Sequence, residues 1–221
     1  MALNLLMLGP PGAGKGTQAE RFARTRGIPK VSTGDILREA VHASTDIGLR
    51  AKAIMDRGEL VGDDVMIEIV RERLERNDAM NGFVLDGFPR TVAQASALDA
   101  IMSQRDPLIV IDIVVQEAEL VRRLSTRMIC DECGTGATVG SAVGAACAKC
   151  GGRLVQRADD NQAVVLDRLK VYHRQSEPLV EYYRVRPTFR SIDGAQAPDR
   201  VAADLVAAVE AAGNGTVGGR G

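Results

Sequence analysis

The sequence predicts an α/β fold with a mostly parallel sheet of five strands and helices on both of its faces. Short unbroken apolar runs alternate with longer stretches of helical period along the chain. This alternation is typical of parallel sheets, whose strands are buried on both faces. A glycine-rich turn, residues 9–14, separates the first apolar run from the first helical stretch, as in folds that bind ligands at the carboxyl edge of the sheet.

Five apolar runs give the expected strands. The clearest is Leu3–Leu8, and two more lie at 83–85 and 108–115. Weaker runs surround Val31 and Ile192. Strands of this length suffice for one sheet in a chain of 221 residues.

Helical patterns lie between these runs. The first is Lys15–Arg26, directly after the glycine-rich turn. Two others have apolar faces, formed by Val65, Met66, Ile69, Val70 and Leu74 and by Leu120, Val121 and Leu124. The acids at 63–64 should begin the former, and Thr91 should cap a helix that ends near residue 103. A long pattern over 159–183 is interrupted near Pro178, and Pro198 begins a closing helix.

The composition is that of a globular protein and excludes disordered and collagen-like chains. Hydrophobic residues make up 45% of the chain and the formal net charge is −1, so one domain with modest insertions is expected. Neither the charge nor the aromatic content of 3% favours nucleic acid or acidic membranes as partners. No apolar stretch approaches a membrane span, and the N-terminal run lacks the basic start of a secretory signal. We therefore expect a cytoplasmic protein.

All four cysteines lie in one segment that is rich in glycine and alanine. Cys130 and Cys133 form one C-x-x-C pair, and Cys147 and Cys150 form a second pair 13 residues later. Four thiolates with this spacing are typical of a tetrahedral structural Zn²⁺ site. Two local disulfides are the alternative, which a reducing compartment disfavours.

The turn after the first strand has the residues of a phosphate-binding loop. It reads Gly-Pro-Pro-Gly-Ala-Gly-Lys-Gly-Thr over residues 9–17. Glycines let backbone N–H groups surround phosphate oxygens at a helix N-terminus, and Lys15 can reach the outer phosphates. Thr17 is one residue later than in the strict motif, because Gly16 follows the lysine.

Asp86 ends the third apolar run, in the sequence Asp-Gly-Phe-Pro-Arg at 86–90. At the carboxyl edge of the sheet it would lie beside the phosphate loop, where it could hold Mg²⁺ through water. Alternatively, it only caps the next turn. A helix start at 32–38 points Arg38 along the same edge.

With these motifs, the chain resembles the adenylate kinases, members of the nucleoside monophosphate kinase family, and specifically the bacterial type with a zinc-binding lid. The match runs from about residue 3 to residue 209 and includes 9–17, 32–38, 86–91 and 156–160. It implies a P-loop three-layer fold with a helical AMP-binding insertion and a small zinc-bearing lid. The expected division is a core of 1–31, 62–126 and 161–212, the insertion at 32–61, the lid at 127–160 and a disordered tail at 213–221.

The resemblance also implies the site residues. Those expected to bind ATP are Gly12, Ala13, Gly14, Lys15, Gly16, Thr17, Arg123, Arg127 and the backbone of Gln196. Those expected to bind AMP are Thr33, Arg38, the backbone of Glu59, Leu60 and Val61, Gly87, Phe88, Pro89, Arg90 and Gln94, with Arg157 and Arg168 entering when the lid closes. The expected catalytic residues are Lys15, Arg38, Arg90, Arg123, Arg127, Arg157, Arg168 and Asp86.

The function implied is reversible, Mg²⁺-dependent phosphoryl transfer between ATP and AMP to give two ADP, by a monomer. No Ser-His-Asp or Cys-His arrangement is evident, and we expect solvated or capping roles for His42 and His173. The segment 134–146 has no aromatic residue, which leaves the choice between ATP and GTP open. Two other functions stay open: a kinase of UMP or CMP, and a zinc-ribbon module that binds nucleic acid under nucleotide control.

Overall fold

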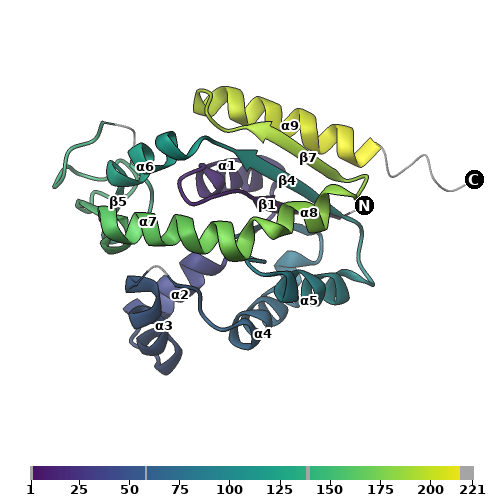
Figure 1. Cartoon of the computed structure of the whole chain (residues 1–221), viewed down its shortest axis with the longest axis horizontal. Helices are drawn as coiled ribbons and strands as arrows, with labels where there is room; N and C mark the ends of the chain where they lie inside the picture. The colour runs from purple at the N-terminus through teal and green to yellow at the C-terminus, as the bar shows by residue number, and fades with distance from the viewer. Residues whose placement is uncertain (1, 58, 138–139, 215–221) are drawn as a thin grey trace, which may run out of the picture.

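The computed structural model describes residues 2–57, 59–137 and 140–214, and its centre is a five-stranded sheet (Figure 1). The strands are β1 (Leu3–Leu8), β2 (Lys30–Ser32), β3 (Gly82–Asp86), β4 (Leu108–Val114) and β7 (Phe189–Asp193). They lie in the order β2-β3-β1-β4-β7, and every neighbouring pair is parallel. The predicted sheet is confirmed at all five positions.

The register of β1 against its neighbours places the functional loops. β1 lies in the middle of the sheet, where Met7 pairs with Asp86 of β3 and Leu8 with Asp112 of β4. The chain turns at Gly9 immediately after β1 ends. The glycine-rich loop and Asp86 therefore leave the same edge of the sheet side by side.

Helices cover both faces of the sheet, as the unbroken apolar strands predict. Alternate residues of β1 enter different cores: Leu5 and Met7 pack with α1 (Lys15–Arg26) and α9 (Pro198–Asn214), whereas Leu6 and Leu8 pack on the other face. That second face is covered by α4 (Asp63–Leu74), α5 (Val92–Met102) and α8 (Pro178–Arg184). In Figure 1, α9 lies on one side of the strands, and α4 and α5 lie on the other.

Several helix ends are fixed by the residues that predicted them. Ser32 caps α2 (Thr33–His42) by accepting a hydrogen bond from the N–H of Asp35 at 3.2 Å. Thr91 caps α5 in the same way, with the N–H of Gln94 at 3.2 Å. α3 (Asp46–Asp56) packs on α2 and begins at the cap Thr45.

The long helical pattern at 159–183 is interrupted, as expected near Pro178. It consists of a 3₁₀ turn (Ala158–Asp160), α7 (Gln162–Val171), a π-helical turn (Tyr172–Ser176) and α8. Because the wider turn precedes the proline, α8 begins afresh with Pro178 at its first position, where the missing N–H costs no bond.

The remaining elements are small. A 3₁₀ turn (Asn77–Ala79) precedes β3, and α6 (Glu117–Ser125) follows β4. The cysteine-rich segment folds as an antiparallel hairpin of β5 (Met128–Cys130) and β6 (Leu154–Gln156). The predicted tail begins too early, because α9 continues through Gly213 to Asn214, and residues 215–221 lie outside the described part. Within the described helices, no apolar stretch is long enough to cross a membrane.

Candidate active site

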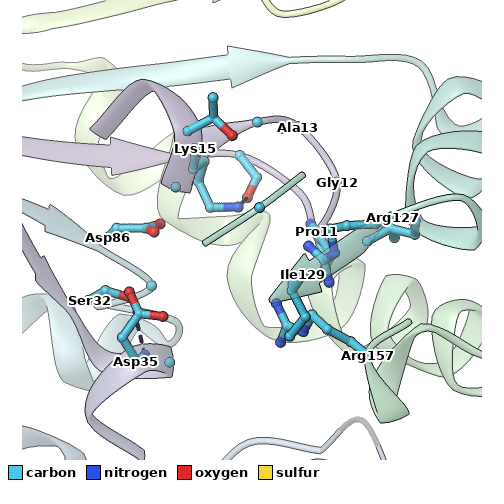
Figure 2. A pocket seen from close by; sticks show the side chains of 18 of the residues that line it. Pro11, Gly12, Ala13, Lys15, Ser32, Asp35, Asp86, Arg127, Ile129 and Arg157 are labelled. Atoms are coloured by element: carbon cyan, nitrogen blue, oxygen red, sulfur yellow. Dashed lines mark hydrogen bonds between the residues drawn. The ribbon is translucent and has the colours of Figure 1, made fainter. Parts of the chain in front are cut away.

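One large cleft at the carboxyl edge of the sheet collects most of the predicted site residues. Its volume is about 1360 Å³, above the roughly 300–1,000 Å³ that one small ligand usually needs. The walls come from the glycine-rich loop, α2, segments 59–61 and 86–90, α6, the cysteine hairpin, α7 and segment 194–198. In Figure 2, Lys15 and Asp86 lie across the cleft from Arg127 and Arg157.

The glycine-rich loop is held in a conformation that only glycine adopts readily. Gly9 and Gly12 have φ of +132° and +86°, and a Cβ on Gly9 would lie 2.5 Å from the carbonyl oxygen of Ile113. The loop runs directly into α1, whose first residue is Lys15. The N-terminus of α1 therefore faces the cleft, which favours an anion there.

Lys15 folds back over its own loop. Its Nζ donates to the carbonyl oxygens of Gly9 at 2.7 Å and Pro10 at 2.9 Å. Burial of the ammonium group lowers the pKa of Lys15 from 10.5 to about 8, although the nearby charge of Asp86 opposes this. A phosphate in the loop would supply the negative charge that this ammonium group lacks.

Asp86 lies at the wall beside Lys15, where the register of β1 and β3 predicts it. It lines the cleft, and its carboxylate makes no hydrogen bond or ion pair with a described residue. The capping alternative therefore has no support, whereas a half-buried carboxylate without a protein partner suits a hydrated cation.

Arg38 comes from α2 and lines the same cleft. Its guanidinium group pairs with Asp35, which also pairs with Lys30 at 3.0 Å. Burial would raise the pKa of Asp35, but the charges of Arg38 and Lys30 hold it at about 2, below the usual 3.8. The two cations thus share one carboxylate, and incoming phosphate can compete for Arg38.

Arg90 and Gln94 are positioned by a compact set of bonds around Gly87. The Gly87 carbonyl accepts from Arg90 Nε and from the Thr33 hydroxyl, both at 2.8 Å. Gln94 Oε1 accepts from the backbone N–H of Arg90 at 2.7 Å. Burial lowers the pKa of the Arg90 guanidinium, which Asp86 partly offsets.

Three arginines converge on two adjacent aspartates at the base of the hairpin. Asp160 is fully buried and accepts from Arg127 at 2.6 and 2.7 Å and from Arg168 at 3.1 Å. Asp159 accepts from Arg157 at 2.8 and 2.9 Å and pairs with Arg168 at 2.9 Å. Burial lowers the pKa of Arg168 to about 10 and lowers that of Arg127 as well. Arg168 comes from α7, which begins after the hairpin ends.

The remaining predicted ATP contacts line the far end of the cleft. Arg123 Nε donates to Glu119 at 2.7 Å, one turn earlier on α6. Gln196 lies in the loop after β7, where its side chain donates to the Asp193 carbonyl and to Asp204 at 3.1 and 2.9 Å. Gln196 also lines the cleft.

The four cysteines form a cluster in the hairpin. Their sulfur atoms all lie within 4.8 Å of one another, with Cys130 Sγ 3.4 Å from Cys150 Sγ and Cys133 Sγ 3.7 Å from Cys147 Sγ. A tetrahedral zinc with Zn–S bonds of about 2.3 Å places its sulfurs about 3.8 Å apart. The set therefore fits zinc. All four cysteines are free thiols, and these shortest distances join different C-x-x-C pairs rather than the local ones.

Both histidines lie at the surface, as expected. His42 is the exposed last residue of α2. The ring nitrogens of His173 lie 3.0 Å from Glu177 and 3.2 Å from Glu117. His42 also lines the large cleft.

Sequence reasoning missed the residues that hold the predicted ones in place. Asp159 and Asp160 stood in a recognised motif without a role, and nothing marked the Ser176 hydroxyl, which donates to the Arg90 carbonyl at 2.9 Å. Asp63 was assigned only to the start of α4, yet it accepts from Gln94 Nε2 at 2.7 Å. The sequence did offer one signal for these partners: two acidic residues, Asp159 and Asp160, follow Arg157 closely enough to pair with it.

Known proteins resemble this chain over nearly its whole length. The family model described as adenylate kinase matches residues 7–188. The adenylate kinase of Archaeoglobus fulgidus is 47% identical over 216 residues, which is 94% of this chain and 98% of the relative. That of Geobacillus sp. is 49% identical over 208 residues, 92% of this chain and 96% of the relative. That of Magnetococcus marinus is 46% identical over 210 residues, 93% of this chain and 99% of the relative.

Proposed function

The chain belongs to the adenylate kinase family and catalyses the reversible conversion of ATP and AMP into two ADP, and we propose which of its residues bind each nucleotide and which stabilise the transferred phosphoryl group. One observation carries the proposal: the glycine-rich loop, Arg90 and the converging arginines line a single cleft of about 1360 Å³. Two nucleotides can therefore meet phosphate to phosphate.

The donor nucleotide, ATP, binds at the glycine-rich loop in this proposal. Backbone N–H groups of Gly12, Ala13, Gly14, Gly16 and Thr17, with Lys15, would hold its phosphates at the N-terminus of α1. Arg123 and Arg127 line the side of the cleft beyond the loop, and the backbone at Gln196 lies where the base would rest. Thr135, Gly136 and Ala137 of the hairpin also line the cleft. They offer backbone contacts but no aromatic ring, and Thr138 lies outside the described residues.

The acceptor nucleotide, AMP, binds on the other side of Asp86. Thr33, the segment of Glu59, Leu60 and Val61, and Gln94 would hold its adenosine, whereas Arg38 and Arg90 would hold its phosphate with Gly87, Phe88 and Pro89 behind them. Arg157 and Arg168 lie between the two nucleotides. The support is that each of these cations lines the cleft, where it bonds to protein carboxylates or carbonyl oxygens that phosphate oxygens could replace.

Catalysis in this proposal consists of alignment and charge neutralisation. The attacking group is an oxygen of the AMP phosphate, which is already anionic, so no side chain has to remove a proton. Lys15 and the arginines would leave their present partners for phosphate oxygens and stabilise the charge that spreads over the transferred group. Asp86 would hold a hydrated Mg²⁺ that enters with ATP and that supplies further charge neutralisation when bound.

Closure over the bound nucleotides would exclude water, the competing acceptor. We propose that the insertion at 32–61 and the lid at 127–160 are the parts that close on the core. The hairpin has only a small cluster of buried apolar side chains around Cys130, Cys147 and Leu154. Zinc bound by the four cysteines would therefore stabilise the hairpin as a rigid lid, and its role is structural because four thiolates leave no open position.

A coupled assay of ADP formation, across AMP, UMP, CMP and GMP as acceptors and with ATP or GTP as donors, tests the proposal. Metal content is measured on the same preparation. We expect ADP from ATP and AMP, dependence on Mg²⁺, and about one zinc per chain. A folded, zinc-loaded sample that forms no ADP, or that prefers another acceptor, contradicts the proposal.

A cytoplasmic monomer is also part of the proposal. The support for the compartment is that the four clustered cysteines suit a metal site, which a reducing compartment favours over disulfides. The monomer rests on the family likeness. Light scattering after size exclusion checks it, and a stable dimer would overturn it.

A further inference from the structure

Gln94 lines a narrow slot at the acceptor end of the cleft. The slot also contains Thr33, Leu37, Val61 and Met66, so its walls are largely apolar. Gln94 itself is only 1% exposed. The slot itself is small, about 20 Å³, and it opens beside residues that also line the large cleft. The Gln94 amide is a polar group in its wall that could read the edge of a base bound against it.

Both ends of the Gln94 amide are already tied to the protein. Oε1 accepts from the backbone N–H of Arg90 at 2.7 Å, and Nε2 donates to Asp63 Oδ1 at 2.7 Å. The other oxygen of Asp63 accepts from the Thr91 hydroxyl at 2.8 Å. Thr91 in turn accepts from the N–H of Gln94. Asp63, Thr91 and Gln94 thus form a closed ring of hydrogen bonds.

This ring allows only one orientation of the amide. Rotating it by half a turn would point Oε1 at the Asp63 carboxylate, where two acceptors repel, and Nε2 at the Arg90 N–H, where two donors repel. An unpaired buried polar group is costly in either place. The amide therefore keeps one remaining lone pair on Oε1 and one remaining N–H on Nε2, in a fixed order.

We propose that Asp63 sets the base specificity of the acceptor site by fixing the orientation of the Gln94 amide; this rests on the proposed function of the site. An amide with this order matches a base edge that has a ring nitrogen acceptor beside an amino group, as adenine and cytosine have. In the same pose, hypoxanthine, guanine or uracil would place a carbonyl oxygen against Oε1 and a ring N–H against Nε2, where like groups repel. Asp63 is a positioning residue, because it acts through Gln94.

The sharpest test compares AMP with inosine monophosphate, which differs only in carrying an oxo group for the amino group and an N–H on the adjacent ring nitrogen. We expect the wild type to prefer AMP by about 10- to 100-fold in kcat/KM, the range for one bidentate contact to a base. In Asp63→Asn the carboxylate repulsion is gone and the new amide can donate to a rotated Gln94, so that only the backbone N–H of Arg90 still opposes the rotation. The preference should then fall at least about tenfold and KM for AMP should rise, with KM for ATP unchanged.

Asp64→Asn is the matched control. Asp64 is the neighbouring acid in the first turn of α4, it is exposed, and its side chain makes no hydrogen bond or ion pair with any described residue. This substitution removes the same charge from the same helix end and should leave the preference for AMP over inosine monophosphate intact. Asp63→Ser is a second variant, because a hydroxyl both donates and accepts, and melting curves report whether each variant is folded.

The outcomes distinguish the role of Asp63 from the placement of the acceptor site. If the wild type uses both acceptors equally, or if folded Asp63→Asn and Asp63→Ser keep its preference, the inference is wrong. If Gln94→Leu leaves KM for AMP unchanged as well, the acceptor site itself is misplaced and the proposed function of these residues fails. A CMP-over-UMP preference in the wild type that is lost in the Asp63 variants would support the inference again.

Discussion

Replacing Asp160 by asparagine should destabilise the unliganded protein by an amount that the structure lets us estimate. Asp160 is fully buried and compensates Arg127 through two bonds and Arg168 through a third. Removing one partner of a buried ion pair costs about 3–5 kcal/mol. The side chain of Arg127 is 28% exposed, and Arg168 would still pair with Asp159. We therefore expect a loss of stability at the lower end of this range, about 3 kcal/mol. For a domain of this size that corresponds to a Tm lower by about 6–12 °C.

The same arginines are proposed to bind phosphate, which makes the effect depend on ligand. A ligand of two adenosines joined by a five-phosphate chain would give Arg127 and Arg168 new anionic partners. It should therefore raise the Tm of Asp160→Asn at least as much as that of the wild type. Differential scanning calorimetry with and without this ligand measures both values.

Asp131→Asn is the control, because Asp131 lies in the same hairpin but pairs with Arg153 at 3.7 Å at the surface. Its Tm should stay within about 1 °C, as expected for an exposed pair. An Asp160→Asn variant that melts within 2 °C of the wild type refutes the idea that Asp160 holds these cations. A smaller ligand-induced rise in the variant would contradict their role in binding phosphate.

Three further predictions follow from the site. Lys15→Ala or Arg90→Ala should lower kcat/KM about 100- to 1,000-fold with little change in Tm; near-normal turnover would remove them from the mechanism. Because the pKa of Lys15 is about 8 in the free protein and only its charged form pairs with phosphate, affinity for ATP is full below pH 8 and is lost as pH rises. KM for ATP should rise about tenfold from pH 7 to 9, and a flat profile would be inconsistent with this. Cys147→Ser should lose zinc and melt at a lower temperature, whereas unchanged melting with zinc still bound would show that this thiol is not a ligand.

The fold was predictable because each strand is buried on both faces. Leu3–Leu8 is apolar at five of its six positions, since one alternate set packs on α1 and α9 and the other on the opposite face. Local signals also fixed several helix starts, such as Ser32 and Thr91. The C-terminal boundary was wrong at Gly213, because contacts of α9 with the sheet sustain a helix that its glycine does not favour.

The site residues that lie in sequence motifs were predictable, whereas the residues that hold them in place by hydrogen bonds were not. The glycine-rich loop, Asp86 and the cysteine pairs identify their chemistry by residue type and spacing. The bonds that orient them connect distant positions: Asp63 lies 31 residues from Gln94, and Ser176 lies 86 residues from Arg90. Such pairs depend on how α4, α5 and the π-helical turn pack together, which no local pattern encodes. Likewise, the acids at 159–160 gain meaning only once α7 brings Arg168 beside them.

A crystal structure with the two-adenosine, five-phosphate ligand would test the account most directly. We predict one adenine at the backbone of Gln196, with its phosphates at the glycine-rich loop, and the other adenine beside Gln94. The guanidinium groups of Arg38, Arg90, Arg157 and Arg168 should be turned from their aspartates and carbonyls onto the phosphate chain. Arginines that keep their present protein partners, while the ligand lies elsewhere in the cleft, would contradict it.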